Sequence, residues 1–258
     1  IVTPAEQPTA VISRPVGAEQ STVPTAEPPT VRVDDSVVPA LELSPEIQRF
    51  PVVVRGQKLP GYRAVKRAFD LLVVALLAPI ALLVVGLCAA VNKLQDRSAP
   101  VFHVQERTGA GGRRFRLLKI RTMVTNAEEL KAGLIHLNTR TYPDFKVEND
   151  PRITPLGKTL RATSLDEMPQ LWNVLSGDMT LVGPRPTTLP PSAYASWQTE
   201  RFEVRPGLTG LWQLDGRDSP SFAERARLDI AYVRRRSVRF DLYILLRTIP
   251  AVLGGRGE

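Results

Sequence analysis

The longest feature of the hydropathy pattern is an apolar run from Leu71 to Val91, which holds twenty-one residues without a charged side chain. A helix of this length, at about 1.5 Å per residue, is long enough to cross a hydrocarbon core of roughly 30 Å. The buried helix of a soluble protein usually keeps one polar face, and this run has none. The pattern therefore predicts a membrane-inserted helix over residues 61–98.

The flanks of this run are basic on both sides, and a proline lies at its centre. Lys66 and Arg67 precede the run, and Lys93 and Arg97 follow it, so the positive-inside bias selects no orientation. Pro79 removes one backbone hydrogen bond and bends a helix. Two topologies fit this pattern: a hairpin that enters and leaves by the same leaflet, and a kinked helix that spans the bilayer.

The pattern changes to short amphipathic segments after the membrane helix. Residues 100–123 alternate as two short strands around a glycine-rich turn, which predicts a β-hairpin. Helical spacing predicts four helices, over residues 126–138, 163–176, 191–203 and 221–236. Residues 232–255 join an arginine cluster to a Leu/Ile-rich face, which is typical of an amphipathic helix in the membrane interface and equally of a packed C-terminal helix. The expected fold is mainly α with a small β-hairpin.

Residues 1–60 show neither helical spacing nor the alternation of a strand. They contain ten prolines and too little apolar surface to offset the entropy of ordering, which predicts a disordered linker or tail. The sequence begins at Ile1 and shows no signal peptide. Three regions are therefore expected: the tail over 1–60, the membrane helix over 61–98 and a folded domain over 99–258.

Charge is distributed unevenly along the chain. The formal net charge is +8, yet residues 1–50 carry seven acidic and three basic side chains, so the remainder is strongly basic. A basic body indicates an anionic partner, such as nucleic acid, a phosphorylated ligand or membrane headgroups. Aromatic residues are few and are not interleaved with the basic clusters as base-stacking platforms would be, which argues against nucleic acid.

Two adjacent carboxylates, Asp166 and Glu167, begin the predicted helix at 163–176 and allow two interpretations. Ser164 and Glu167 have the spacing of a capping box, in which the serine and glutamate side chains satisfy backbone N–H groups at a helix start. The partial positive charge of a helix N-terminus also favours acidic residues there. Alternatively, one carboxylate is a nucleophile and its neighbour is a metal ligand, at a helix start that Pro169 fixes just beyond them.

Elimination of other chemistries favours phosphoryl transfer. One cysteine and two separated histidines form no zinc pattern, and no G-x-S-x-G motif supports a serine triad. Carboxylates, arginines and Mg²⁺ are the groups that phosphoryl transfer uses. Arg161 precedes the carboxylate pair, and Arg185 lies between two prolines in a stiff turn. Lys119 and Arg121 belong to a strand that alternates basic and apolar residues, with one slip at Leu118.

Four ordered segments resemble one known family. The segments are KRAFDLL, ERTGAGGRRFRLLKIRTM, DPRITPLGKTLRATSLDEMPQLWNVLSGDMTLVGPRP and RPGLTGLWQLDGR. Together they resemble the bacterial sugar transferases, which are monotopic polyprenol-phosphate phosphoglycosyl transferases that start exopolysaccharide, O-antigen and glycoprotein glycan assembly. The resemblance extends over roughly residues 62 to 255.

The resemblance implies a monotopic membrane protein whose residues 66–91 form a re-entrant helix broken at Pro79, with amphipathic helices in the interface. Some members have a serine before this proline, where this chain has Ala78. The domain at 99–258 would be the catalytic domain, on the cytoplasmic face of the bacterial inner membrane. Larger members carry a membrane bundle and a soluble domain ahead of this core, so the chain is expected to be a small member or the catalytic part of a larger one.

The resemblance also implies roles for the candidate site residues. Asp166 and Glu167 match the Asp-Glu dyad of the family, with Asp166 as the nucleophile and the pair as ligands of Mg²⁺. Three basic positions of the family's active site match Lys119, Arg161 and Arg185. Arg121, from the basic face of the same strand as Lys119, is expected to bind substrate with them.

The implied reaction transfers a hexose 1-phosphate from a UDP-sugar to undecaprenyl phosphate and releases UMP, through a covalent phosphosugar on Asp166, with Mg²⁺ neutralising the diphosphate. Proline-rich lead-ins often accompany exopolysaccharide-type members, which favours glucose or galactose 1-phosphate. The expected partners are the UDP-sugar, the polyprenyl phosphate and inner-membrane lipid, without nucleic acid, and a homo-oligomer is compatible with the sequence. The alternative is a non-catalytic, membrane-tethered basic binding protein of the polysaccharide machinery.

Overall fold

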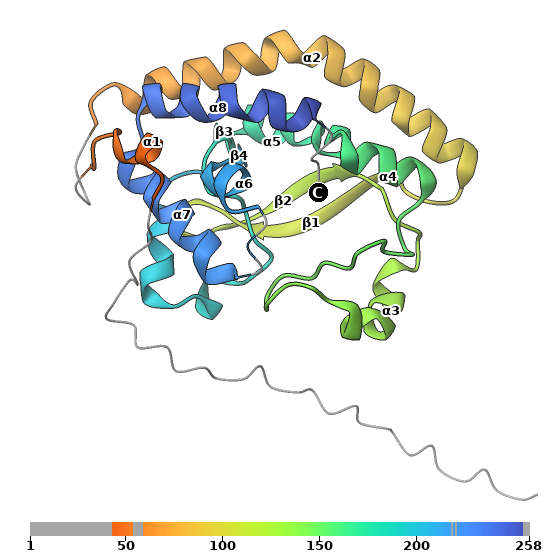
Figure 1. Ribbon diagram of the computed structural model, residues 1–258. Coiled ribbons are helices and arrows are strands. Elements are labelled where there is room, and N and C mark those ends of the chain that lie inside the picture. The colour runs from red at the N-terminus through yellow and green to blue at the C-terminus, as the bar shows by residue number, and fades with distance from the viewer. Residues whose placement is uncertain (1–42, 54–58, 218, 220, 255–258) are drawn as a thin grey trace, which may run out of the picture. The chain divides into compact units, whose positions relative to one another are not determined.

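The structure, a computed structural model, describes residues 43–53, 59–217, 219 and 221–254 (Figure 1). Most of the predicted tail, with the disorder expected for it, lies outside the described residues. Within residues 43–53 the short helix α1 (Pro45–Gln48) places Ile47, which is 1% exposed, in the main core cluster. The described end of the predicted tail is therefore packed onto the domain.

The long helix α2 (Tyr62–Gln95) contains the predicted apolar run in 34 residues. Its length and composition are sufficient to cross a membrane, and only 17% of its most apolar window is buried. Leu72, Leu76, Leu82 and Leu83 are each more than half exposed. The prediction of one long apolar helix that is compatible with membrane association is confirmed.

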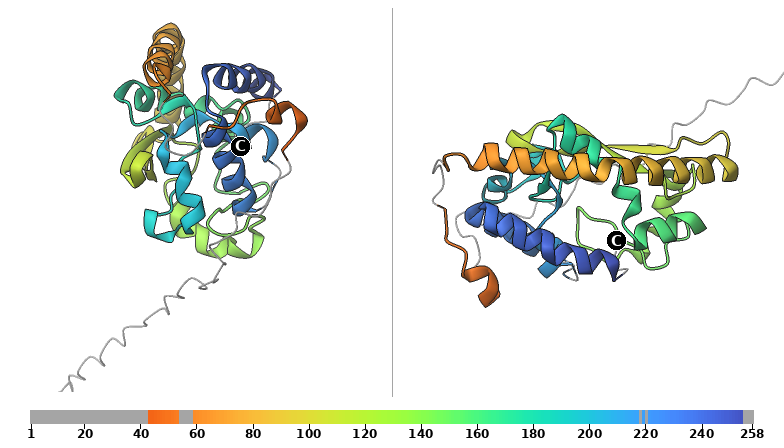
Figure 2. Two further views of the ribbon diagram at one scale, coloured as in Figure 1. Left: turned by 90° about the vertical axis from the view of Figure 1, so that its left-hand side faces the viewer. Right: turned by 90° about the horizontal axis from the view of Figure 1, so that it is seen from above.

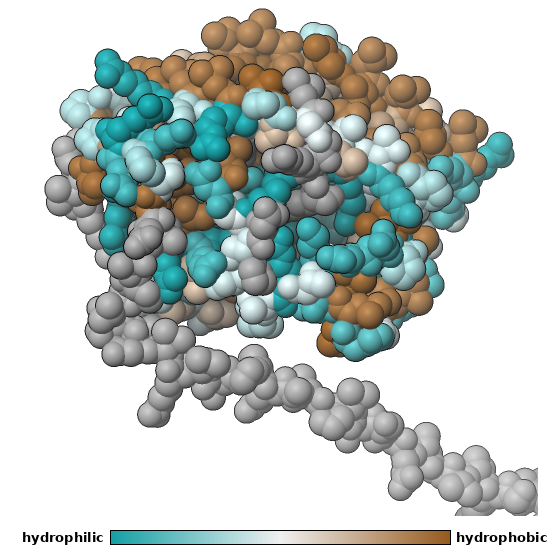
Figure 3. All heavy atoms as spheres, in the orientation of Figure 1, coloured by the Kyte–Doolittle hydropathy of each residue, from teal (hydrophilic) through white to brown (hydrophobic). Residues whose placement is uncertain are grey.

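This helix runs through Pro79 without interruption and curves along its length (Figure 1). The hydrogen bond that a proline removes permits such bending. Hydrophobic surface is gathered along α2 (Figure 3), and α8 (Val238–Leu253) lies on the same side of the domain (Figures 1 and 2). α8 exposes Leu242, Leu246 and Ile249, which lie on one helix face. The break expected at Pro79 is absent, because the helix curves through the proline without ending. The re-entrant topology and the interfacial position of α8 remain predictions.

The predicted β-hairpin is confirmed. β1 (Phe102–Thr108) pairs antiparallel with β2 (Arg114–Ile120), and His103 lies opposite Lys119 in the register. The turn between the strands contains Gly111 and Gly112, whose φ angles are 62° and 74°. Glycine adopts this left-handed region without steric cost, so the glycine-rich sequence is a turn.

A second, parallel pair of strands was not predicted. β3 (Thr180–Val182) pairs with β4 (Gly207–Thr209), and Thr180 lies opposite Gly207. The two strands approach so closely that a Cβ atom on Gly207 would lie 2.1 Å from the backbone nitrogen of Gly183. This pair fixes the start of the segment that leads from β3 to Arg185.

Of the four predicted helices, only the one over 221–236 forms as a single α-helix, and the others are divided or partly 3₁₀. Residues 126–138 form α3 (Ala127–Lys131) and the 3₁₀ helix η2 (Ala132–Leu137), and residues 221–236 form α7 (Phe222–Arg235). Residues 191–203 form two 3₁₀ helices, η4 (Pro191–Ala193) and η5 (Ser196–Glu203). Three α-helices were not predicted: α1 in the expected tail, α4 (Pro155–Ala162) and α6 (Leu211–Asp215). The coarse expectation of a mainly helical domain with a small hairpin is confirmed.

The helix predicted over 163–176 is divided. The 3₁₀ helix η3 (Leu165–Glu167) is followed by α5 (Gln170–Ser176), which ends at Gly177 with φ 89°. Pro169 has no N–H to continue the hydrogen bonds of the preceding turn, so it separates the two pieces. The carboxylate pair therefore lies on a short turn of its own rather than within a regular helix.

Buried polar contacts fasten α2 to the strands behind the site. Asp70, which is 2% exposed, accepts hydrogen bonds from the Thr180 hydroxyl at 2.6 Å and from the Leu181 backbone nitrogen at 3.2 Å. One turn earlier, Lys66 forms a 2.9 Å ion pair with Asp241 of α8. Unpaired groups at these positions would carry a desolvation penalty of about 1–3 kcal/mol each, so the pairing specifies how α2 docks.

Candidate active site

The capping box predicted at the start of this segment is wrong. Ser164 adopts a left-handed conformation, with φ 56°, and its side chain makes no capping hydrogen bond. Glu167 does not reach back to Ser164, because Lys119 and Arg185 bind its carboxylate. Two charged donors are stronger partners for a carboxylate than a neutral backbone N–H.

Glu167 lies in a clamp of two cations. Its Oε1 atom is 2.8 Å from Lys119 Nζ and 2.6 Å from Arg185 Nη2, and its Oε2 atom is 3.3 Å from Arg185 Nη1. Burial alone would raise the pKa of Glu167, but Arg185 and Lys119 outweigh it and hold the pKa well below its usual range. Glu167 is therefore a fixed negative charge.

Asp166 has the opposite electrostatic environment. It is 6% exposed, and its carboxylate accepts none of the hydrogen bonds found among the described residues. Burial raises the pKa of Asp166 to about 6, against the opposing charges of Lys119, Arg161 and Arg185, while the neighbouring Glu167 adds to the rise. Adjacent carboxylates whose pKa values are pushed apart indicate two different chemical roles. A desolvated carboxylate that is free of hydrogen bonds is suited to act as a nucleophile.

Three of the four predicted cations gather at the dyad. Lys119 and Arg185 bind Glu167 directly, while Arg161 on α4 donates from Nε to the Thr122 hydroxyl at 2.9 Å and lowers the pKa of Asp166 by its charge. Arg121 is placed differently.

The nearest carboxylate partner of Arg121 is Asp96 at the end of α2, 3.7 Å from Arg121 Nη1. β2 ends at Ile120, so the strand alternation that predicted a shared face with Lys119 stops before Arg121. The structure therefore places Arg121 beside the end of α2 and not against Asp166 or Glu167, and its role in substrate binding stays a prediction.

His103 is a neighbour of the site that sequence reasoning did not select. It lies opposite Lys119 in the hairpin register. Partial burial of the ring and the charges of Lys119 and Arg107 lower its pKa, so the imidazole is neutral near pH 7. The strand pattern could have identified this pair only if the length of the hairpin turn had been known.

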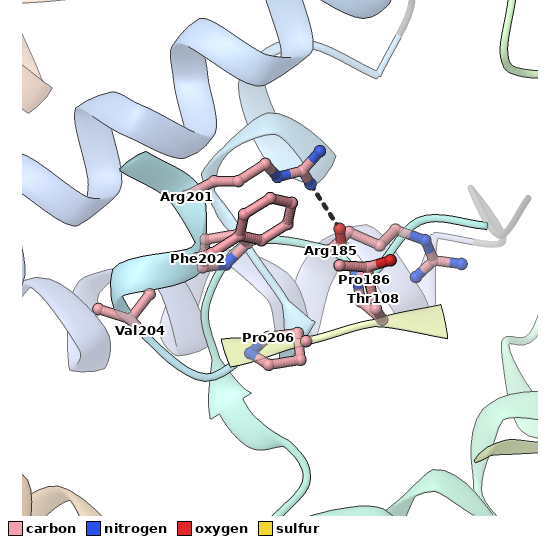
Figure 4. Close-up of a pocket in the computed structure, with 9 residues that line it drawn as sticks. Thr108, Arg185, Pro186, Arg201, Phe202, Val204 and Pro206 are labelled. Carbon is pink, nitrogen blue, oxygen red and sulfur yellow. Dashed lines mark hydrogen bonds between the residues drawn. The ribbon is translucent and has the colours of Figure 1, made fainter. Parts of the chain in front are cut away.

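The loop at 184–186 is held through its three carbonyl groups, and Figure 4 shows the bond from Arg201 to the second of them. The first accepts from the Gly207 backbone nitrogen at 2.9 Å, the second from Arg201 Nη2 at 2.6 Å and the third from Arg107 Nη1 at 3.1 Å. Two of its three residues are prolines, which have no N–H to contribute. The pocket beside the loop has room for little more than a water molecule, so this stretch is tightly packed.

The donor set at the dyad fits Mg²⁺. Among the residues that the structure describes, no group of three or more His, Cys, Asp or Glu side chains could hold a metal ion by itself. Mg²⁺ is usually held by one or two carboxylates together with water and substrate phosphates. The hard oxygens of Asp166 and Glu167 suit an ion that is bound jointly with a diphosphate, and do not form a closed structural metal site.

A sequence profile described as bacterial sugar transferase matches residues 61–255. The chain belongs to the bacterial sugar transferase family. The matched range contains α2, both carboxylates of the dyad, the four predicted cations and the loop at 184–186. The resemblance drawn from the sequence motifs is therefore confirmed.

Several relatives of this bacterial sugar transferase have descriptive names. A galactosyl transferase CpsE of Streptococcus agalactiae is 44% identical over 184 residues, which are 70% of this chain and 41% of the relative. An exopolysaccharide production protein ExoY of Rhizobium meliloti is 41% identical over 202 residues, covering 75% of this chain and 87% of the relative. A UDP-glucose:undecaprenyl-phosphate glucose-1-phosphate transferase of Caulobacter vibrioides is 37% identical over 199 residues, covering 73% and 69%. The chain thus spans about two-fifths of the first relative and most of the second.

Proposed function

We propose that this protein transfers a hexose 1-phosphate from a UDP-sugar to undecaprenyl phosphate and releases UMP, as the first step of exopolysaccharide or O-antigen synthesis. Membership of the family supports this proposal, as do relatives named for galactose and glucose phosphotransfer to undecaprenyl phosphate. The observation that carries it is the buried Asp166 carboxylate, free of hydrogen bonds from the described residues and beside a Glu167 that Lys119 and Arg185 hold ionised.

The proposed mechanism has two displacements at one phosphorus atom. A carboxylate oxygen of Asp166 attacks the phosphorus bonded to the sugar, and the bond to the UMP oxygen breaks so that UMP leaves with the electron pair. An oxygen of the polyprenyl phosphate then attacks the same phosphorus and displaces the Asp166 carboxylate. An acyl phosphate is a reactive intermediate, so the division into two steps is chemically reasonable.

Anionic reactants require positive charge around them, and this chain provides it. Lys119 and Arg185 bind Glu167, and Arg161 acts on Asp166 through its charge. The three cations would stabilise charge on the transferring phosphoryl group. Mg²⁺ held by Asp166 and Glu167 would neutralise part of the diphosphate charge. Glu167, fixed between two cations, cannot move far, which favours a binding role for it over a nucleophilic one.

The proposed setting is the cytoplasmic face of the bacterial inner membrane. α2 offers an apolar surface along its length (Figure 3), and α8, on the same side of the domain (Figure 1), exposes Leu242, Leu246 and Ile249. A re-entrant α2, with basic residues at both ends, would keep the dyad on the side where UDP-sugars are made. The lipid acceptor would reach the site from that membrane surface.

The proposal is tested with detergent-solubilised protein, Mg²⁺ and a panel of UDP-sugars that includes UDP-glucose and UDP-galactose. We expect release of UMP with at least one donor, which also identifies the sugar. Without acceptor, the peptide that contains Asp166 should gain the mass of one hexose phosphate. Absence of UMP with every donor would favour a non-catalytic binding protein instead.

Formation of the adduct should depend on pH through Asp166. Because burial raises the pKa of Asp166 to about 6, its nucleophilic carboxylate is lost as the pH falls through that value. At low UDP-sugar and low Mg²⁺, where the rate reports the free enzyme, the rate of the UMP burst should fall about tenfold per unit below pH 6 and level off above about pH 7. A burst rate that stays flat down to about pH 5 would show that no carboxylate of raised pKa limits the reaction.

Arg185→Lys should weaken use of the nucleotide sugar. Lysine keeps the charge but loses the planar fork that now contacts both Glu167 oxygens. We expect kcat/KM for the UDP-sugar to fall about 10- to 100-fold, which corresponds to about 1–3 kcal/mol. Arg116→Lys, on the exposed face of β2, is the matched control and should leave kcat/KM unchanged. Unaltered kinetics in Arg185→Lys would mean that the Arg185 guanidinium only stabilises the loop at 184–186 and does not contribute to use of the nucleotide sugar.

A further inference from the structure

Arg201 is a buried arginine that no motif of the sequence indicated. It lies on η5 with 4% of its side chain exposed, and its Nη2 atom donates both to the Arg185 carbonyl at 2.6 Å and to Asp229 Oδ2 at 2.6 Å. The aromatic rings of Tyr194 and Phe222 lie 5.7 and 5.9 Å from its guanidinium carbon. The orientation of Arg201 is therefore fixed by an ion pair, a main-chain acceptor and two rings.

The contact with the Arg185 carbonyl is visible in Figure 4, where Arg201 reaches the loop from its own helix. This carbonyl belongs to the residue whose side chain holds Glu167. Both flanking prolines restrict the backbone but contribute no N–H, so the position of the Arg185 main chain depends on donors from other segments. Among the loop's three donors, Arg201 is the one that bonds the Arg185 carbonyl, and the Asp229 carboxylate that pairs with Arg201 also accepts from the Arg185 backbone N–H.

We propose that Arg201, held by Asp229, is a positioning residue for the reaction: it fixes the main chain of Arg185 so that the Arg185 guanidinium meets Glu167 and the donor phosphate. The proposal deepens the function proposed above, and its kinetic test rests on that function. Arg201 acts through Arg185 and touches no reacting atom. A displacement of about 1 Å in such a group can lower a rate by about 100-fold.

Arg201→Gln is expected to fold, because Asp229 can become protonated when the guanidinium is removed. Burial raises the pKa of Asp229 to about 7 even though Arg201 opposes the rise. Without the guanidinium, Asp229 would take up a proton near neutral pH and remain as a neutral acid. The substitution therefore favours the neutral acid at Asp229, which reduces the usual cost of breaking a buried pair, namely an uncompensated buried charge.

The chain offers a control in a second, more exposed ion pair between the same two elements: Arg234 keeps 44% of its side chain exposed and Arg201 only 4%. Arg234 Nη2 on α7 lies 2.6 Å from Glu200 Oε2 on η5, as Asp229 on α7 is paired with Arg201 on η5. No contact joins Arg234 to the loop at 184–186 among the described residues. Arg234→Gln therefore removes an η5–α7 ion pair without removing a donor from the Arg185 carbonyl.

A double-mutant cycle distinguishes positioning from general support of the fold. We expect Arg201→Gln to lower kcat/KM for the UDP-sugar by about tenfold or more, and Arg234→Gln to change it less than about twofold. In an Arg185→Ala background, Arg201→Gln should have little further effect, because the group that it positions is gone. An equal loss in both backgrounds would overturn the proposal.

Hydrogen exchange tests the same contact without substrate. The peptide covering residues 183–189 should exchange its amide protons faster in Arg201→Gln than in wild type, and Arg234→Gln should match wild type. Identical exchange in wild type and Arg201→Gln would refute the proposed positioning. If wild-type protein releases no UMP, the proposed function fails, and the exchange result still decides whether Arg201 holds the loop.

Discussion

Replacement of Asp166 by asparagine should abolish turnover while making the metal-free protein more stable. An amide cannot form the acyl phosphate, so UMP release and the hexose-phosphate adduct should fall by several orders of magnitude. Stability should rise because the folded state disfavours the ionised form of Asp166, as its pKa of about 6 shows. A rise of about two pKa units corresponds to a penalty of up to about 3 kcal/mol, which asparagine does not carry.

The stability gained in Asp166→Asn should depend on pH, because only the ionised form of Asp166 destabilises the folded state. A raised carboxylate pKa gives a penalty that is absent below the unfolded pKa of about 4, grows from there to about pH 6 and is complete above it. Denaturation of wild type and Asp166→Asn in EDTA should therefore differ at about pH 7.5 and converge at about pH 4. Asp178→Asn, which makes the same chemical change on a residue bound to Ser176, is the control for stability and activity. Asp166 would not be the nucleophile if the adduct formed undiminished in Asp166→Asn.

Glu167→Gln should have the opposite effect on stability. The glutamine leaves Lys119 and Arg185 without the charge that binds both of them. Breaking a buried pair costs roughly 3–5 kcal/mol, and the lower end is expected here because these side chains keep 14–19% exposure. Because the pKa of Glu167 is held below its usual range, this stabilisation is present above about pH 4.3 and is lost as the pH falls through the folded value.

The adduct should still form on Asp166 in Glu167→Gln, but slowly and with weaker dependence on Mg²⁺. Intact-mass measurement over time separates a slower reaction from none, and denaturation at two pH values gives the stability difference. Two adjacent carboxylates with stability effects of opposite sign would be hard to explain as a helix cap. If both substitutions destabilised the protein equally, the electrostatic division between Asp166 and Glu167 would be incorrect.

The elements that could be predicted from sequence are those whose signals are local. The apolar run gave α2, the alternation around the glycine-rich turn gave the hairpin, and Pro169 marked the start of α5. β3 and β4 have three residues each, too few to show a period of two. Their pairing joins Thr180 to Gly207, which no local pattern reports.

The site residues also divide into those that local sequence indicated and those that only the fold brings together. The residue types of Asp166, Glu167 and Arg185 indicated phosphoryl chemistry, but the contact of Glu167 with Lys119 spans 48 positions along the chain. The capping-box interpretation failed because it compared only neighbours, whereas a lysine from β2 is the stronger partner. Arg201 and Asp229 carry no motif at all, and only the fold shows that they bond the Arg185 loop.

The hydrogen bonds between Asp70 and β3 fix the distance between the membrane helix α2 and the active site. Asp70 lies at the beginning of the apolar run of α2, and β3 continues through Gly183 into the loop that carries Arg185. With α2 inserted in a membrane as proposed, the dyad would lie at a fixed distance from the layer of lipid headgroups. The acceptor phosphate would be recognised by its depth at the membrane surface. Because a longer or shorter hydrocarbon tail would not change that depth, acceptors of different prenol length should be accepted alike.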